Sequence, residues 1–185
     1  MVEKARLEES EHGLWPVTDG WFVLNVRDAP WMTNEAFGDV AIFESNDVQF
    51  PDVGHSFFVF RPGQPSGLYH REANAEDFLV LAGECLLLVE GEERKLRAWD
   101  FVHCPAGTNH IFVATGEAPC VIFMVGSREG WPEKGIVYPR SETALRHGAG
   151  VERETATPAE AYAPFPRWRL GRRPGVLDDL PWPED

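Results

Sequence analysis

Cysteine is scarce in this chain of 185 residues, which contains only Cys85, Cys104 and Cys120. The number is odd, and no pair has the C-x-x-C spacing that zinc ribbons and redox pairs use. Each cysteine lies among apolar neighbours in the sequence. We therefore expect three reduced, buried thiols in a cytoplasmic protein, because such thiols persist in a reducing compartment.

Long apolar runs are also absent. No window of about 18 apolar residues occurs, so we expect no transmembrane helix. The first residues, Met1–Glu11, are charged and lack the apolar stretch of a secretory signal. We therefore expect a protein that has no membrane as a partner.

Basic residues are few: 17 Lys and Arg stand against 30 Asp and Glu, which gives a net charge of −13. Phosphate affinity comes from clustered Lys and Arg, so this balance argues against a nucleic-acid partner. The charge is −8 over residues 1–55, −4 over 56–126 and −1 over 127–185. We interpret the excess in the first part as a solvated face that says little about ligands.

Apolar residues, at 43%, suffice for a sizeable core, and they concentrate in the middle of the chain. There, short β-rich runs alternate with turns that contain Gly or Pro. The runs are Ser56–Phe60, Asp77–Leu81, Cys85–Val89, Phe101–Cys104, Ile111–Val113 and Val121–Val125. Because no amphipathic helix of about ten residues lies among them, this spacing predicts an all-β fold, a closed antiparallel barrel or sandwich. Trp21–Val26 and Val40–Phe43 are expected to add edge strands.

We expect a single domain with three parts: an N-terminal extension over residues 1–55, a barrel core over 56–126 and a C-terminal arm over 127–185. The arm is rich in Pro, Trp and Arg, and it contains eight of the 15 prolines. Within it, Ser141–Arg146 and Thr155–Tyr162 can each form a helical turn or two. We expect an irregular arm that lies on the barrel or on a partner subunit, where it would cover exposed sheet edges.

Two short segments concentrate residues that can bind a metal. In the first, His70 and Glu72 are two residues apart, so side-chain alternation along a strand puts them on one face. Glu76 begins the following strand, and the second segment is a turn that delivers His110 to the start of its strand. Buried charges need a partner or a cation. Two imidazoles with one or two carboxylates suit Zn, Mn, Ni or Fe(II).

These segments resemble the two motifs of the cupin superfamily. Residues 70–83 read H-x-E-x3-E-x6-G, where the first cupin motif normally has H-x-H-x3–4-E-x6-G. Residues 105–110 read P-x-G-x2-H, as in the second motif, and Asp100 matches the Asp that usually follows that motif's opening Gly. The resemblance covers residues 56–126. It implies a cupin-type antiparallel β-barrel (a double-stranded β-helix or jelly roll) with one divalent metal inside.

Three residues depart from the cupin pattern. Trp99 stands at the opening Gly of the second motif and Ala114 at its late Asn, which affects turns and packing. Glu72 replaces the second His of the first motif. With this replacement, the metal ligands that the resemblance implies are His70, Glu72, Glu76 and His110. Alternatively, Glu72 does not coordinate the metal and acts as a general base that takes a proton from metal-bound water. A barrel that has lost its metal, with its carboxylates paired to His or Arg, is the other alternative.

Further residues are expected around the site. Phe78 and Phe112 are expected among the apolar side chains that line the cavity. His103 lies in an apolar strand, where it either lines the cavity beside the ligands or is a satisfied core histidine.

No nucleophile motif or phosphate loop competes with this interpretation. Because cupins host several reactions on one fold, we expect a metal-dependent enzyme (an oxygenase, isomerase or lyase) that acts on a small organic molecule. The alternatives are a non-enzymatic binder or sensor of a metabolite, and a barrel in which the metal is only structural. A homodimer is expected because members of the family commonly form dimers and because a barrel of this kind would have exposed sheet edges.

Overall fold

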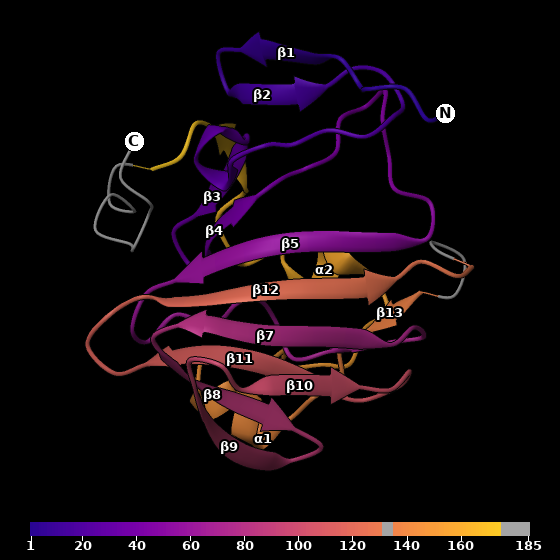
Figure 1. Ribbon diagram of the computed structural model, residues 1–185. Coiled ribbons are helices and arrows are strands. Elements are labelled where there is room, and N and C mark those ends of the chain that lie inside the picture. Colours follow the sequence, from indigo (N-terminus) through magenta and orange to yellow (C-terminus); the bar gives the residue numbers. More distant parts are fainter. Residues whose placement is uncertain (131–134, 175–185) are drawn as a thin grey trace.

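Antiparallel strands dominate the computed structural model of the chain, which describes residues 1–130 and 135–174 (Figure 1). One sheet has seven strands in the order β10-β7-β12-β5-β4-β3-β14, and a second has three in the order β11-β8-β9. Two further pairs are β1–β2 and β6–β13. The strands are β1 (Leu7–Ser10), β2 (Gly13–Pro16), β3 (Trp31–Asn34), β4 (Gly38–Ala41), β5 (Val53–Phe60), β6 (Arg71–Glu72), β7 (Glu76–Ala82), β8 (Glu84–Val89), β9 (Glu92–Arg97), β10 (Phe101–Cys104), β11 (His110–Thr115), β12 (Cys120–Ser127), β13 (Ile136–Val137) and β14 (Arg169–Gly171).

The two larger sheets share one apolar core, which makes the domain an antiparallel β-barrel of the jelly-roll type. Side chains alternate across β5: Phe58 and Phe60 point into this core, while Val59 between them packs on the outer face. The buried core residues are Phe58, Phe60, Phe78, Val80, Cys104, Cys120 and Ile122 from the large sheet, and Cys85, Leu87, Phe112 and Ala114 from the small one. All three cysteines are free and buried. The predicted all-β barrel is confirmed.

The six barrel strands predicted from the sequence lie within β5, β7, β8, β10, β11 and β12. The sequence prediction missed β9, because five of its six residues are exposed and Leu96 is its one apolar residue. An edge strand of this kind lacks the alternation of apolar and polar residues by which strands are recognised.

The predicted edge strands are correct only in part. Val40–Phe43 overlaps β4, but Trp21–Val26 is not a strand, and a single bridge joins Trp21 to Lys4. Leu24 and Val26 instead pack beside the buried Trp31 on the outer face of the large sheet. Leu24 and Val26 are therefore partly buried by packing onto a face rather than by pairing along an edge, whereas Trp21 and Val23 stay exposed. The 3-10 helix Val26–Asp28 follows, with Asn25 as its N-cap.

The described part of the C-terminal arm packs on the barrel. Helix α1 (Glu142–Arg146) covers the outer face of the small sheet, where Ala144 is buried with Leu86 and Leu88. Helix α2 (Pro158–Ala161) leads to Phe165 and Trp168, whose rings lie 4.9 and 6.4 Å from the ring of Phe37. Strand β14 then pairs with β3. Residues 131–134 and 175–185 of the predicted arm lie outside the described residues.

Trp99 adopts a backbone conformation that suits glycine. Its φ of +75° lies in the left-handed region, which L residues rarely occupy. The cupin motif that this chain resembles normally has Gly at this position, in the turn between β9 and β10. Trp99 is 77% exposed, so its side chain meets no crowded core. The cost of the substitution therefore lies in the backbone.

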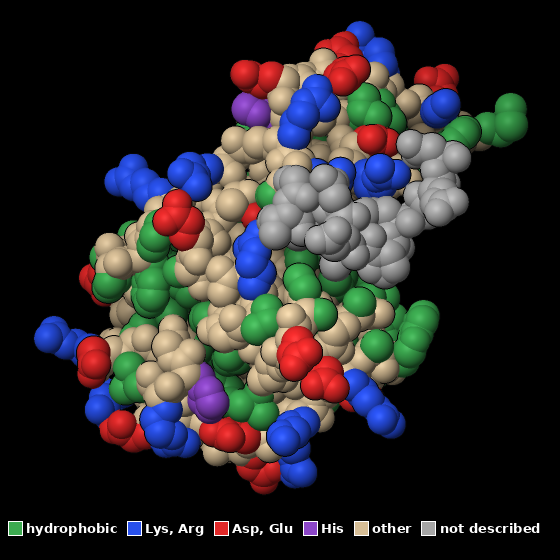
Figure 2. Space-filling view, turned by 90° about the vertical axis from the view of Figure 1, so that its left-hand side faces the viewer, with side chains coloured by type: hydrophobic (Ala, Val, Ile, Leu, Met, Phe, Trp, Pro, Cys, Tyr) green, Lys and Arg blue, Asp and Glu red, His purple; other side chains and the backbone are tan. Residues whose placement is uncertain are grey.

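The surface carries charges of both signs. On the face drawn in Figure 2, basic and acidic side chains are interspersed, with apolar side chains between them. Ion pairs at the surface of the described residues include Arg6 with Glu8 at 2.7 Å and Arg172 with Glu9 at 3.1 Å. Among the helices in the described ranges, none is long and apolar enough to cross a membrane.

Candidate metal centre

Three side chains converge where β7 and β11 begin. Glu76 is the first residue of β7, His110 is the first of β11, and His70 directly precedes β6. The two histidines are joined by their backbones: His70 N–H donates to His110 O at 3.2 Å, and His110 N–H donates to His70 O at 2.8 Å. This bridge places the two imidazole rings 4.9 Å apart.

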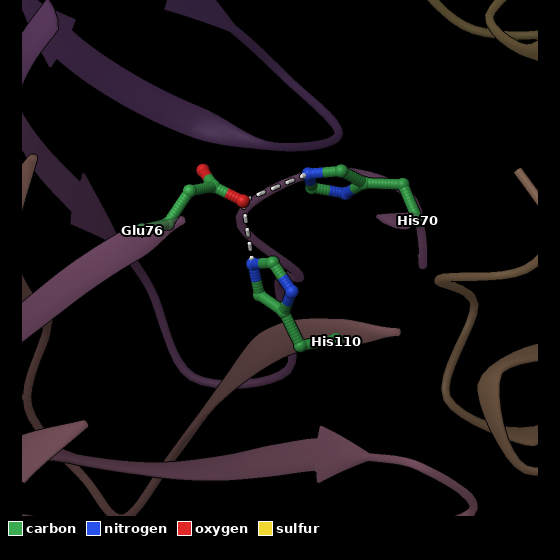
Figure 3. A group of neighbouring side chains, drawn as sticks. All are labelled: His70, Glu76 and His110. Atoms are coloured by element: carbon green, nitrogen blue, oxygen red, sulfur yellow. Dashed lines mark ion pairs between the residues drawn. The ribbon is translucent and has the colours of Figure 1, made fainter. Parts of the chain in front are cut away.

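The carboxylate of Glu76 faces both imidazoles (Figure 3). Its Oε2 is 3.3 Å from Nε2 of His110 and 4.0 Å from Nε2 of His70. One ligand atom from each of the three residues lies within 4.8 Å of the others, so these three residues could hold one metal ion.

Hydrogen bonds to backbone carbonyls fix the tautomer of both histidines. Nδ1 of His70 lies 2.8 Å from the carbonyl of Leu68, and Nδ1 of His110 lies 3.0 Å from the carbonyl of Thr108. A carbonyl only accepts, so each Nδ1 carries the hydrogen and each Nε2 keeps a free lone pair. Metal-ligating histidines are usually oriented in this way. The donor set of two Nε2 atoms and one carboxylate therefore fits a divalent transition metal.

Burial sets the charge of these groups. It lowers the pKa of His70 to about 3, with a further contribution from His110. Burial also lowers the pKa of His110, so both imidazoles are neutral at neutral pH. It raises the pKa of Glu76 to about 8, and the carboxylate of Glu72 adds to the shift. Without a cation, this group holds a proton on Glu76 at neutral pH, and a bound metal would replace that proton.

A family model described as "Cupin domain" matches residues 56–126, the segment that supplies all three of these residues. The chain carries a cupin domain. No curated protein sequence matches the chain significantly.

Solved structures resemble the cupin domain and its flanks. The polyketide cyclase RemF from Streptomyces resistomycificus is 16% identical, with a TM-score of 0.51, over 59% of this chain and 80% of that one. At this identity, the likeness shows the fold alone. A Cupin 2 conserved barrel domain protein from Salinispora arenicola is 26% identical, with a TM-score of 0.40, over 45% of this chain and 69% of that one.

A proposed sugar phosphate isomerase from Acidithiobacillus ferrooxidans is 25% identical, with a TM-score of 0.42. The alignment covers 46% of this chain and 54% of that one, so it spans about half the length of each protein.

Of the four predicted ligands in the cupin domain, the structure brings together His70, Glu76 and His110 but not Glu72. The backbone of Glu72 is held in place, since its carbonyl accepts from the N–H of Gly107 at 2.7 Å. Burial raises the pKa of its carboxyl. Its assignment as a ligand or a general base stays a prediction.

A cavity of about 460 Å³ opens beside this group. Glu72 and Glu76 are in its wall, whereas His70 and His110 are not. The other residues that line it are Met32, Val40, Ala41, Ile42, Glu44, Gly54, His55, Ser56, Met124, Gly126, Ser127 and Arg128. A small molecule in this cavity would therefore have Glu72 and Glu76, but not the two imidazoles, in the surrounding wall.

The expectation that His103 lines the cavity or lies in the core is wrong. Its side chain is 55% exposed, and its Nδ1 lies 2.6 Å from Oδ1 of Asp77. Strand alternation explains the difference, because Cys104 is the neighbour that points into the core. Phe78 and Phe112 are buried in the core, and the ring of Phe78 lies 5.1 Å from that of His110.

Two residues next to the site escaped the sequence analysis. The ring of Tyr138 lies 6.0 Å from that of His70, and burial raises the pKa of Tyr138. The hydroxyl of Tyr162 accepts from the N–H of Leu68 at 3.2 Å. Both tyrosines belong to the C-terminal arm, and no motif or spacing relates them to the cupin motifs. Only the folding of the arm onto the barrel brings them there.

Proposed function

We propose that this cupin domain is a metal-dependent enzyme that acts on a small organic molecule. The observation that carries the proposal is the geometry of His70, Glu76 and His110, whose ligand atoms lie within 4.8 Å of one another. Two fixed imidazole tautomers with free Nε2 atoms and one buried carboxylate are the donor set of a two-histidine, one-carboxylate site. That set suits Zn, Mn, Ni or Fe(II).

Three protein ligands leave coordination positions for a substrate. Structural metal sites are usually closed by four protein ligands, whereas catalytic sites keep a position open. A divalent metal held by these residues would polarise an oxygen of the bound molecule. The neighbouring cavity of about 460 Å³ lies within the size range of small-molecule sites and supports binding of that molecule next to Glu76.

We propose that Glu72 transfers a proton during the reaction, as a general acid or base. It lies in the cavity wall beside Glu76, and burial raises the pKa of its carboxyl toward the range useful to a general acid or base. Accepting a proton from the substrate or from water would suit an isomerase or a lyase. The reaction also depends on the metal, since Fe(II) would favour oxygenation.

Metal analysis tests the proposal. The protein is purified without added metal, and its metal content is compared with that of the His110→Ala and Glu72→Gln variants. We expect close to one metal ion per chain in the parent, loss of the metal in His110→Ala, and retention in Glu72→Gln. Substoichiometric metal in the parent, with stability and ligand binding unchanged in the variants, would contradict the proposal.

Turnover separates an enzyme from a binder. The metal-loaded protein is incubated with mixtures of small organic acids, sugars and phenols, and substrate loss is followed by NMR. We expect the parent to consume a compound that Glu72→Gln binds but converts slowly. A compound that binds stoichiometrically and is never converted would favour the alternative of a metabolite-binding or sensor cupin.

A further inference from the structure

A row of apolar side chains crosses the inner face of the large sheet and continues beyond the barrel core. Val40 of β4 pairs with Phe58 of β5, and Met32 of β3 pairs with Val40. Leu170 of β14 pairs in turn with Met32. Side chains that oppose each other across strands lie on one face of a sheet. The row begins at Phe58, which is 8% exposed, and ends at Leu170, which is 43% exposed, so the face stays apolar beyond the part that the core buries.

A cavity of about 610 Å³, called the hairpin cavity below, lies between the β1–β2 hairpin and the outer part of this face. Met32, Ile42 and Leu170 line it from the sheet, and Trp15 and Val17 line it from the hairpin side. In Figure 1 the hairpin lies on the side of β3 and β4, far from β8 and β9 of the small sheet. Apolar side chains that face a cavity gain contacts when an apolar molecule binds there.

Hydrogen bonds at both strands of the hairpin hold it in this position. Nη2 of Arg172 donates to the carbonyl of Ser10 in β1 at 2.9 Å. The hydroxyl of Ser45 donates to the carbonyl of Pro16 in β2 at 2.7 Å. These two bonds tie the hairpin to distant parts of the chain, so the fold itself sets the space between hairpin and sheet.

The hairpin cavity adjoins the cavity of about 460 Å³ beside the metal group, called the inner cavity below. The residues that line both cavities are Met32, Ile42 and Glu44. Beyond these shared residues, the wall of the inner cavity includes Met124 and Glu76. One molecule that extends past the shared residues would therefore contact Glu76 at one end and the hairpin at the other.

The charges in the two walls disfavour an anion. Among the described residues that line the cavities, Arg128 is the one Lys or Arg, and Glu44 accepts from both of its terminal nitrogens. The other acidic residues in the walls are Glu72 and Glu76 in the inner cavity and Glu8, Glu9 and Asp47 in the hairpin cavity. Glu8 and Glu9 pair with arginines outside the walls. A carboxylate or phosphate would lose its hydration without gaining an unpaired cation, whereas an uncharged molecule needs none.

We propose that the two cavities together bind one elongated, uncharged and largely apolar molecule. Its reacting end lies beside Glu76, and its far end lies against Trp15 and Val17. Met32 and Met124 suit such a ligand, because the flexible side chain of methionine adapts to different shapes. As a statement of substrate class, this inference rests on the proposed function; as a binding groove, it stands without a metal.

Two separate clefts are the competing explanation. In that case a small apolar molecule occupies one cleft or neither, and lengthening it brings no gain in affinity once the cleft is full. The two explanations differ in how affinity depends on ligand length, because only a continuous groove buries the additional methylene groups of a longer chain.

Charged substitutions at the far end of the proposed groove provide the test. Leu170→Asp places a carboxylate in the hairpin cavity from β14, on a side chain that is already 43% exposed. Val17→Asp places the same charge in it from the hairpin side, so the test does not depend on how β14 tolerates the change. Val23→Asp is the matched control, since Val23 is 82% exposed and lines neither cavity. Thermal melts establish that the three variants fold.

Binding of hexanol, octanol and decanol to the metal-free protein is measured by NMR titration. We expect affinity to rise about tenfold with each added pair of methylene groups. Leu170→Asp and Val17→Asp should each weaken decanol binding about tenfold or more, but hexanol binding less than about twofold, because hexanol fits within the inner cavity. Val23→Asp should change neither. Equal affinities of the parent for hexanol and decanol, or equal weakening of both alcohols in the two cavity variants, would overturn the inference.

Decanoate tests the uncharged character of the ligand, since it has the same length as decanol and carries a carboxylate. We expect it to bind the metal-free protein about tenfold or more weakly than decanol. Equal binding of decanoate and decanol would overturn this part of the inference.

Metal analysis and the same titrations with metal-loaded protein separate this inference from the proposed function. If the protein takes up no metal but decanol binds and is weakened by Leu170→Asp, the groove stands and the metal-dependent function fails. If the protein takes up metal but binds hexanol and decanol equally, the metal centre stands and the groove is overturned.

Discussion

Strand β7 presents two consecutive carboxylates to opposite faces of the large sheet, and each meets a histidine. Glu76 points inward, 3.3 Å from His110, and its side chain is 16% exposed. Asp77 points outward, 2.6 Å from His103, and its side chain is 47% exposed. The outer pair has the shorter contact. A short distance between carboxylate and imidazole is therefore not what distinguishes a candidate metal site.

Burial and a second imidazole make the difference. His110 is 2% exposed and His103 is 55% exposed, so water solvates the outer pair and screens its attraction. The inner carboxylate also faces Nε2 of His70, whose Nδ1 is held by a carbonyl. Only the inner group combines three ligand atoms with an environment that disfavours an isolated charge, and it is there that a cation would be stabilising.

Replacing each carboxylate by its amide gives the largest contrast. Glu76→Gln removes the only negatively charged ligand of the inner group. We therefore expect this variant to bind Zn²⁺ or Mn²⁺ about 100-fold or more weakly than the parent, a larger loss than that caused by removing a residue that only hydrogen-bonds to a metal ligand. Asp77→Asn should bind metal as the parent does. Affinity is measured by competition with a chromophoric chelator. Equal losses in the two variants would show that the two faces do not differ as proposed.

The pH dependence of metal uptake sharpens the same comparison. Because the pKa of Glu76 is about 8 and that of His70 about 3, the metal-free group at pH 7 holds a proton on Glu76 and none on His70. Metal binding should therefore release about one proton at pH 7 and none well above pH 9. Calorimetry in buffers of different ionisation enthalpy counts the protons. A release that does not change with pH would contradict the raised pKa.

The free energy of unfolding of the metal-free protein should depend on the protonation of the same groups. The folded pKa of Glu76, about 8, exceeds its usual 4.5, so the folded chain binds more protons than the unfolded chain between these values. Above about pH 6.5, the free energy of unfolding should therefore fall as pH rises to 8, whereas between about 3 and 6.5 the lowered pKa of His70 opposes this fall. In Glu76→Gln this fall should be smaller, whereas Asp77→Asn should keep it. Urea unfolding at several pH values measures the difference.

Local pattern predicted that His70, Glu76 and His110 come together, but it also put Glu72 among them, which the structure does not. The barrel strands are short apolar, β-rich runs separated by turns, and the residues of the inner group sit at motif spacings near strand starts. The direction of His103 was not predictable from its apolar neighbours, because the register of β10 decides which face it occupies. Likewise, β9 has too few apolar residues to be recognised, and Trp21–Val26 has the residues of a strand but only packs Leu24 and Val26 partly against the sheet.

Contacts between distant parts of the chain could not be predicted either. Arg128 is paired with Glu44, 84 residues away, and Tyr162 meets Leu68 across 94 residues. Neither pair has a local pattern, since the geometry exists only after the extension and the arm have folded onto the barrel. These residues surround the candidate site, whereas His70, Glu76 and His110 occupy motif positions, which is why that group was easier to predict than its surroundings.

Tyr162→Phe tests how firmly the inner group is positioned. The hydroxyl of Tyr162 accepts from Leu68 N–H, and the carbonyl of Leu68 accepts from Nδ1 of His70 at 2.8 Å, so loss of the hydroxyl should loosen that ligand. We expect about tenfold weaker metal binding, the size typical for partners of metal ligands. Tyr69→Phe is the control, because its hydroxyl accepts from Gly91 instead. Equal effects of the two variants would exclude a positioning role.

The smallest effect is expected for His103→Ala on the outer face. An exposed ion pair gains little from its Coulomb attraction, because water competes for both partners and salt screens them. The free energy of unfolding should therefore change by no more than about 0.5 kcal/mol, and metal content should not change. Urea unfolding and metal analysis of His103→Ala measure both. A loss of metal in this variant would mean that the outer pair communicates with Glu76 through β7, and the contrast between the two faces would no longer hold.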